Sequence, residues 1–137
     1  MRFVLDASVT LSWFVDRPVA PYAAHVKQLL LEESQAVVPV IWRLEVANGF
    51  VMTERRGLSL PSDTTEMLQA LDVVLQSIET ISDSVSMRQI IATSREFRLT
   101  AYDAAYLELA RAQKLPIATL DRRIKAAAAQ AGIASVQ

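Results

Sequence analysis

The sequence of 137 residues contains no cysteine and only one histidine, His25. Without cysteine there is no thiolate zinc site and no cysteine nucleophile, and the absence fits a reducing compartment such as the cytoplasm. A single imidazole excludes any site that needs two. Glycine and proline are also scarce, with three and five residues, in a chain that is 52% apolar. This composition favours a compact core without long linkers.

Long apolar runs and a strong net charge are missing too. No stretch approaches the roughly 20 residues that span a bilayer, and Asp6 interrupts the early apolar segment, so we expect neither a membrane span nor a secretory signal. The net charge of −1 gives no global attraction to nucleic acid, and any such binding must depend on local patches. We expect one cytoplasmic domain over residues 1–137, burying roughly 68% of its unfolded surface.

The most informative segment is LTAYDAAYLELARAQKLPIATLDRRI, residues 99–124. Thr100 followed by Asp103 has capping-box spacing and predicts the start of a helix. The next residues are apolar on nearly every face, which is typical of an interior helix. A proline then ends the helix, and residues 117–120 have the length of a buried strand. Asp121 follows this strand, so it lies at the carboxyl edge where α/β sheets bind ligands.

The rest of the chain alternates in the same way. Further strands are expected at 2–5, 36–38, 77–81 and 134–136. Further helices are expected at 7–15, 21–33, 39–57 and 122–131. Two more helices are expected, one capped by Ser62 and one that follows Ser82 and Asp83 and ends at residue 97. Strands that alternate with helices predict a parallel sheet covered on both faces. The predicted fold class is α/β, with a central, mostly parallel sheet of roughly four to five short strands and about seven helices.

Three acids fall where this arrangement brings strand ends and helix starts together. Asp6 and Asp121 each close a strand, so both belong to the carboxyl edge of the sheet. Asp103 begins the helix that leads into the strand before Asp121. Right-handed crossovers place the starts of such helices along the same edge.

A fourth acid, Glu45, lies on the helix expected at 39–57. It is in line with Asn48 and with three apolar residues, Ile41, Leu44 and Met52. This spacing predicts the buried stripe of the helix, interrupted by Glu45 and Asn48. An unpaired acid on such a stripe is rare, so it calls for a function.

Four carboxylates cannot share a pocket without compensation, because like charges repel and burial adds a desolvation penalty. A divalent cation removes both difficulties. Oxygen ligands without histidine or cysteine indicate Mg²⁺ or Mn²⁺ rather than Zn²⁺.

Each acid also has a local explanation. Asp103 could complete the capping box of Thr100, and Asp6 and Asp121 could cap the helices that follow them. Two hydroxyls, those of Ser8 and Thr119, could join the pocket or cap local turns.

The motifs resemble those of a known family. The matching segments, in chain order, are VLDASV at 4–9 with Trp13 and Phe14, RLEVAN at 43–48, TAYDAAYLELA at 100–110 and ATLD at 118–121. Together they resemble PIN-domain proteins of the VapC toxin type, the ribonuclease half of a toxin–antitoxin pair. The resemblance implies a PIN-like fold and hydrolysis of RNA phosphodiester bonds with one or two Mg²⁺ (or Mn²⁺) ions.

The resemblance also implies residue roles and partners. Asp6, Glu45, Asp103 and Asp121 would form the metal-binding catalytic cluster, the last often acting through water, with Ser8, Asn48 and Thr119 as supporting positions. A small VapB-like antitoxin would inhibit the enzyme, with Trp13, Phe14 and Trp42 as candidates for the apolar part of its groove. A homodimer is expected by analogy.

RNA binding would need cations near the acids. The candidates for contacts with RNA phosphates are Arg111, Lys114, Arg122, Arg123 and Lys125. The alternative is that these residues form ordinary solvated helix faces.

Two other functions remain open from the residues. A Mg²⁺-dependent phosphatase of the haloacid-dehalogenase type would want a second aspartate two residues after its nucleophile, where this chain has Ser8. A PIN-like module that has lost catalysis would bind a partner only, although the set of four acids counts against it.

Overall fold

The computed structural model describes residues 1–82 and 85–137. Its sheet is built in these ranges from β1 (Arg2–Leu5), β2 (Gln35–Pro39), β3 (Ile78–Ile81) and β4 (Ile117–Ala118). The strand order is β3-β2-β1-β4, and every neighbouring pair is parallel. The predicted α/β class with a parallel central sheet is therefore confirmed.

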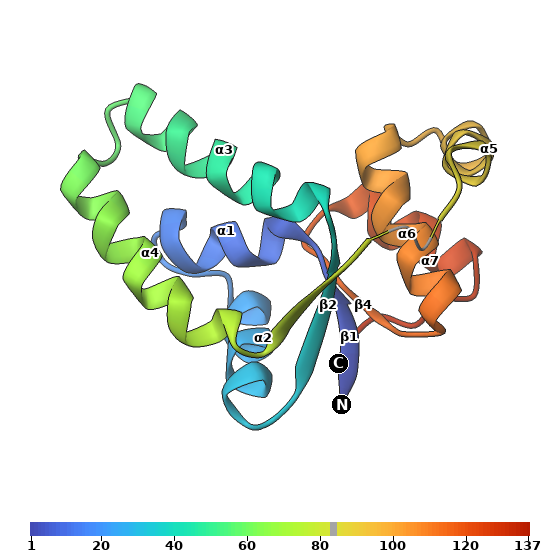
Figure 1. The fold of residues 1–137 in the computed structure, drawn as a ribbon, viewed down its shortest axis with the longest axis horizontal. Coiled ribbons are helices and arrows are strands. Elements are labelled where there is room, and N and C mark those ends of the chain that lie inside the picture. The colour runs from blue at the N-terminus through green and yellow to red at the C-terminus, as the bar shows by residue number, and fades with distance from the viewer. Residues whose placement is uncertain (83–84) are drawn as a thin grey trace.

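Helices cover both faces of the sheet, as Figure 1 shows. One layer holds α1 (Ala7–Val15), α2 (Pro21–Leu31), α3 (Ile41–Arg55) and α4 (Pro61–Leu75), and the other holds α5 (Met87–Phe97), α6 (Ala101–Gln113) and α7 (Arg122–Gln130). None of the helices in the described ranges is both long enough and apolar enough for a bilayer crossing.

The core follows from strands that are apolar on both faces. The segments 3–5 and 36–38 are fully buried, as a parallel sheet between two helical layers requires. Helix α6 packs on β1 and β2, and its residues from Tyr106 to Ala110 are all buried, as its apolar sequence predicts. On the other face α1 and α3 approach closely at Gly49, where a Cβ atom would overlap the side chain of Leu11. This close approach fixes α3, which carries Glu45, against α1, which Asp6 precedes.

Several predicted boundaries are wrong. Pro39 ends β2 opposite Ile81, and α3 begins at Ile41. A proline fixes φ near −65°, which suits both a strand end and a helix start, so the residue alone could not decide. The predicted last strand at 134–136 is a single bridge between Ile117 and Ser135.

Two helix starts also differ from the prediction. Ser62 is not a cap, because α4 begins at Pro61 and the Leu60 N–H donates to Asp63 Oδ2 at 2.7 Å. A proline in the first turn and an acid two residues later therefore outweigh the capping preference of serine. Helix α5 is capped by Ser86, and the predicted flanking residue Asp83 lies outside the described residues.

Candidate active site

A pocket of about 300 Å³ opens at the carboxyl ends of β1 and β4. The structure brings six of the predicted site residues to its wall, and the rest of the wall is small or apolar. The six are Asp6, Ser8, Glu45, Asn48, Asp103 and Asp121, and their neighbours are Ala7, Leu11 and Gly49. Four segments that are far apart in the sequence therefore meet at one edge of the sheet, as strand ends and helix starts predict.

Asp6 is the most deeply buried of the four acids, with 4% of its surface exposed. Its Oδ2 atom accepts hydrogen bonds from Ser8 Oγ at 2.5 Å and from Thr119 Oγ1 at 2.7 Å. Although Asp6 precedes α1, its carboxylate makes no capping bond to that helix among the described residues. Burial raises the pKa of Asp6, the two hydroxyls lower it, and the charges of Asp103 and Asp121 raise it again. The carboxylate is thus oriented by hydroxyls, and within residues 1–82 and 85–137 it forms no ion pair.

The hydroxyls of Ser8 and Thr119 both donate to Asp6, although only Ser8 of the two lines the acid pocket. Besides donating to Asp6, Ser8 Oγ accepts from the Leu120 N–H at 3.0 Å, and Thr119 Oγ1 accepts from the Asp121 N–H at 2.9 Å. These bonds join the turn after β1 to the turn after β4. The two hydroxyls therefore hold the turn and aim the carboxylate at the same time.

Glu45 comes from α3, where the predicted buried stripe is wrong in register. The buried residues of this helix are Trp42, Val46 and Phe50, whereas Leu44 is 66% exposed. The apolar face is turned by about one residue, or 100° of helix rotation, from the predicted one. Glu45 consequently lies at the border of the apolar face, half-buried, instead of at its centre.

The Glu45 carboxylate has a partner that the sequence prediction missed. Tyr106, from α6, donates its hydroxyl to Glu45 Oε1 at 2.6 Å. Burial raises the pKa of Glu45, the Tyr106 bond lowers it, and the charges of Asp6 and Asp103 raise it. Tyr106 is itself fully buried, and a buried tyrosine hydroxyl needs a polar partner. The sequence could have indicated this partner, because Tyr106 lies one helical turn after Asp103 and therefore on the same side of α6.

Asp103 stands in the first turn of α6. The Thr100 hydroxyl accepts from the Asp103 N–H at 3.1 Å, which is one half of a capping box. In the described residues the Asp103 carboxylate does not return a bond to the Thr100 N–H. Burial raises the pKa of Asp103, as does the charge of Asp121, while Thr100 and Arg123 lower it.

Asp121 differs from the other three acids because, among the described residues, it is the one whose side chain caps a helix. Its Oδ1 atom accepts from the N–H groups of Arg123 and Ile124 at 2.8 and 3.1 Å, so it caps α7. The capping alternative is therefore correct for Asp121, even though the residue also lines the pocket.

The pocket as a whole is anionic, and the Arg123 charge acts on it without forming an ion pair. No ion pair reaches any of the four acids from a lysine or arginine of residues 1–82 and 85–137. Carboxylates, an amide and hydroxyls are the oxygen donors that hard divalent cations prefer. As the side chains stand, however, no three acids of the described chain converge closely enough to hold one ion. The donor chemistry fits Mg²⁺ or Mn²⁺, and a shared ion needs side-chain rotation.

The predicted basic residues separate into groups. Arg122 and Arg123 begin α7 beside Asp121, and the Arg123 charge acts on Asp103. Arg111 and Lys114 lie at the other end of α6, about 12 Å or more along the axis from Asp103. Arg111 is also paired there with Glu108, at 3.1 Å.

The fifth predicted cation, Lys125, lines a separate pocket with Tyr22 and Thr119. The structure therefore does not bring Arg111, Lys114 or Lys125 to the acid pocket.

The chain matches the family described as PIN domain over residues 3–130. It belongs to the PIN domain family. It is 26% identical over 124 residues to Ribonuclease VapC3 of Pyrobaculum aerophilum, which covers 90% of this chain and 92% of the relative. The predicted resemblance to VapC-type PIN proteins is thereby confirmed.

Solved structures support the same fold. A Pyrobaculum aerophilum crystal structure superposes with a TM-score of 0.70 at 22% identity, covering 93% of this chain and 79% of the other. VapBC2 from Rickettsia felis, bound to a DNA fragment from its promoter, gives a TM-score of 0.59 at 15% identity over 92% of both chains.

Proposed function

We propose that this PIN-domain protein is a Mg²⁺- or Mn²⁺-dependent endoribonuclease, the toxin of a toxin–antitoxin pair. The observation that carries the proposal is the convergence of four acids from four separate segments on one pocket, where no lysine or arginine of residues 1–82 and 85–137 forms an ion pair with any of them. The similarity to a protein named Ribonuclease VapC3 supports RNA as the substrate.

The ion would be held by Asp6, Glu45 and Asp103, with Asp121 nearby. When bound, it supplies an activated water and offsets the charge that grows on the phosphate and the leaving oxygen. No side chain in the pocket has to become a covalent nucleophile.

Other residues of the chain orient the metal-binding carboxylates and supply positive charge for RNA phosphates. Ser8 and Thr119 fix the Asp6 carboxylate, and Tyr106 fixes Glu45. Arg122 and Arg123, exposed at the start of α7, are placed to bind the phosphates that flank the cleaved bond.

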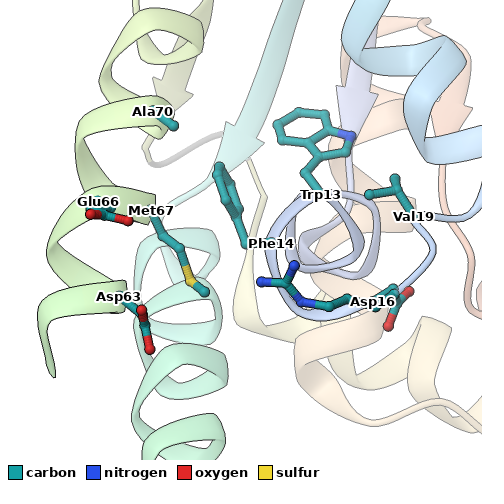
Figure 2. A pocket seen from close by; sticks show the side chains of 9 residues that line it. Trp13, Phe14, Asp16, Val19, Asp63, Glu66, Met67 and Ala70 are labelled. Carbon is teal, nitrogen blue, oxygen red and sulfur yellow. The ribbon is translucent and has the colours of Figure 1, made fainter. Parts of the chain in front are cut away.

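An antitoxin is the protein partner that we propose. Beyond the acid pocket, a second hollow of about 290 Å³ lies between α1 and α4. Figure 2 shows Phe14 and Met67 in the space between these helices, with Asp63 and Glu66 along α4. An antitoxin segment with apolar and basic side chains would complement this surface.

The three aromatic residues predicted for the antitoxin groove differ in exposure. Trp42 and Trp13 are only 1% and 7% exposed, so of the three only Phe14, half-buried, offers an apolar contact there. A homodimer, the expected state of the free toxin, can be measured by light scattering.

The deciding experiment is cleavage of a mixed-sequence single-stranded RNA by the purified chain, with Mg²⁺ or with EDTA. Wild type should cleave only with the metal, and Asp6→Asn should not cleave. Asp72→Asn is the matched control, because Asp72 is an exposed acid on α4 away from the pocket.

Other outcomes would favour the rival functions. Hydrolysis of a phosphate monoester without RNA cleavage would indicate a phosphatase. Binding of a partner without any hydrolysis would indicate an inactive PIN module.

A further inference from the structure

Tyr106 links two of the acid-bearing segments. It belongs to α6, one turn after Asp103, and its hydroxyl donates to Glu45 Oε1 of α3 at 2.6 Å. This hydroxyl therefore connects α3, which carries Glu45, to α6, which carries Asp103.

The bond from Tyr106 occupies only one of the two carboxylate oxygens of Glu45. A phenol hydroxyl has one hydrogen to donate, and Oε1 receives it. In the part of the chain that the structure describes, Oε2 accepts no hydrogen bond. Asp6 repeats the pattern, since the Ser8 and Thr119 hydroxyls both donate to Oδ2 and none of the described groups donates to Oδ1. Each of the two carboxylates thus has one oxygen anchored by the protein and one oxygen available to a ligand.

We propose that Tyr106 is a positioning residue, which anchors Oε1 of Glu45 and so leaves Oε2 to bind the divalent cation. The inference rests on the proposed function, because it assigns Tyr106 a role toward the metal site. Glu45 needs such a partner more than Asp6 does. Its side chain is longer, and it is half-buried at the border of the apolar face of α3.

A purely structural role makes a different prediction. A buried tyrosine that only fills the core would lose stability on removal of its hydroxyl, and metal affinity would not change. Tyr22→Phe provides a matched control, since it also deletes a hydroxyl with a defined acceptor, the Val136 carbonyl oxygen at 3.0 Å. Tyr22 is not among the residues that line the acid pocket.

The test is calorimetric titration of the metal-free full chain with Mn²⁺, in the absence of RNA. Partners that orient metal ligands typically contribute about 10- to 100-fold to metal affinity, so Tyr106→Phe should raise the Kd for Mn²⁺ by roughly that factor. Tyr22→Phe should leave it unchanged. In cleavage assays Tyr106→Phe should lower kcat at limiting Mn²⁺ with little effect on KM, and excess Mn²⁺ should restore part of kcat.

Two further variants keep the test decisive if Tyr106→Phe folds poorly. Glu45→Asp retracts the carboxylate from an intact Tyr106 and should weaken Mn²⁺ binding to a similar extent. In a Glu45→Gln background, Tyr106→Phe should have no additional effect on Mn²⁺ affinity, because the two residues act through one bond.

The outcomes separate the two proposals. If wild type binds Mn²⁺ and cleaves RNA while Tyr106→Phe binds Mn²⁺ equally well, the positioning role is wrong and the proposed function stands. If wild type neither binds Mn²⁺ nor cleaves RNA, the proposed function fails and this inference fails with it.

Discussion

Asp6 and Glu108 are buried to the same depth, each with 4% of its surface exposed, but their surroundings differ. Glu108, on the other side of the sheet from α1, accepts a hydrogen bond from Thr93 and pairs with Arg111 at 3.1 Å. Asp6 has two hydroxyl donors, other acids nearby, and no ion pair with a lysine or arginine among the residues that the structure describes. Depth of burial therefore does not distinguish these two acids. They differ in that Glu108 forms an ion pair and Asp6 forms none with residues 1–82 and 85–137.

The largest expected difference concerns activity. Glu45→Gln and Asp103→Asn should each lower Mg²⁺-dependent RNA cleavage by at least about 100-fold, since loss of a ligand should cost no less than loss of a partner that orients one. Expression of wild type alone should slow growth, and both substitutions should relieve it. Glu108→Gln should retain cleavage. Equal toxicity of soluble wild type and both pocket variants would remove the nuclease proposal.

The second prediction concerns the difference in stability between Asp6→Asn and wild type, which should change sign between EDTA and Mg²⁺. In EDTA, Asp6→Asn should be as stable as wild type or more stable, because it removes repulsion among the acids. With Mg²⁺ at 100 times its Kd, wild type should gain about 2.7 kcal/mol, and the variant should gain less. Thermal melting in both buffers measures this crossover. For Asp121→Asn the cap should survive, because asparagine caps nearly as well as aspartate.

If Asp6→Asn were destabilised equally in both buffers, the shared-site argument for this residue would be wrong. Glu108→Gln serves as the comparison, because it should be less stable than wild type in EDTA and in Mg²⁺ alike.

The third prediction is that the protein loses stability when Glu108 loses the hydroxyl donor Thr93. Thr93→Val keeps the shape of a buried side chain but removes the hydroxyl that donates to Glu108, which should cost about 1–3 kcal/mol. Thr65→Val is the control, since the exposed Thr65 hydroxyl bonds only to the Pro61 carbonyl of its own helix. Urea unfolding compares the two variants. Equal midpoints for Thr93→Val and wild type would show that Glu108 needs no hydroxyl donor.

The smallest expected effect is a pH dependence. The pKa values of Asp6, Glu45 and Asp103 are raised in the folded protein, in each case first by burial. The folded state then holds protons that the unfolded state has released, so these groups destabilise the metal-free protein as pH rises from about 4 through the raised values. The stability of Asp6→Asn relative to wild type in EDTA should increase over the same range. A difference that does not change with pH would contradict this.

The positions of Asp6 and Asp103 followed from local sequence, because strand ends and capped helix starts are short-range features. The face of α3 did not, since both of its sides carry apolar residues and only neighbouring elements decide which side is buried, as exposed Leu44 shows. The partner of Glu45 was also out of reach, because the Tyr106–Glu45 bond joins residues 61 positions apart. Arg111 was assigned to RNA although an acid three residues earlier could have indicated its pairing.

The bond between Thr119 and Asp6 spans 113 positions of the chain, and it joins the residue directly after β1 to the residue directly after β4. During synthesis β1 is made early, and β4 follows roughly 5 to 25 s later at common elongation rates. Until that moment the carboxylate of Asp6 lacks one of its two anchors and the pocket lacks Asp121. A nascent chain therefore carries no finished pocket for most of its own translation.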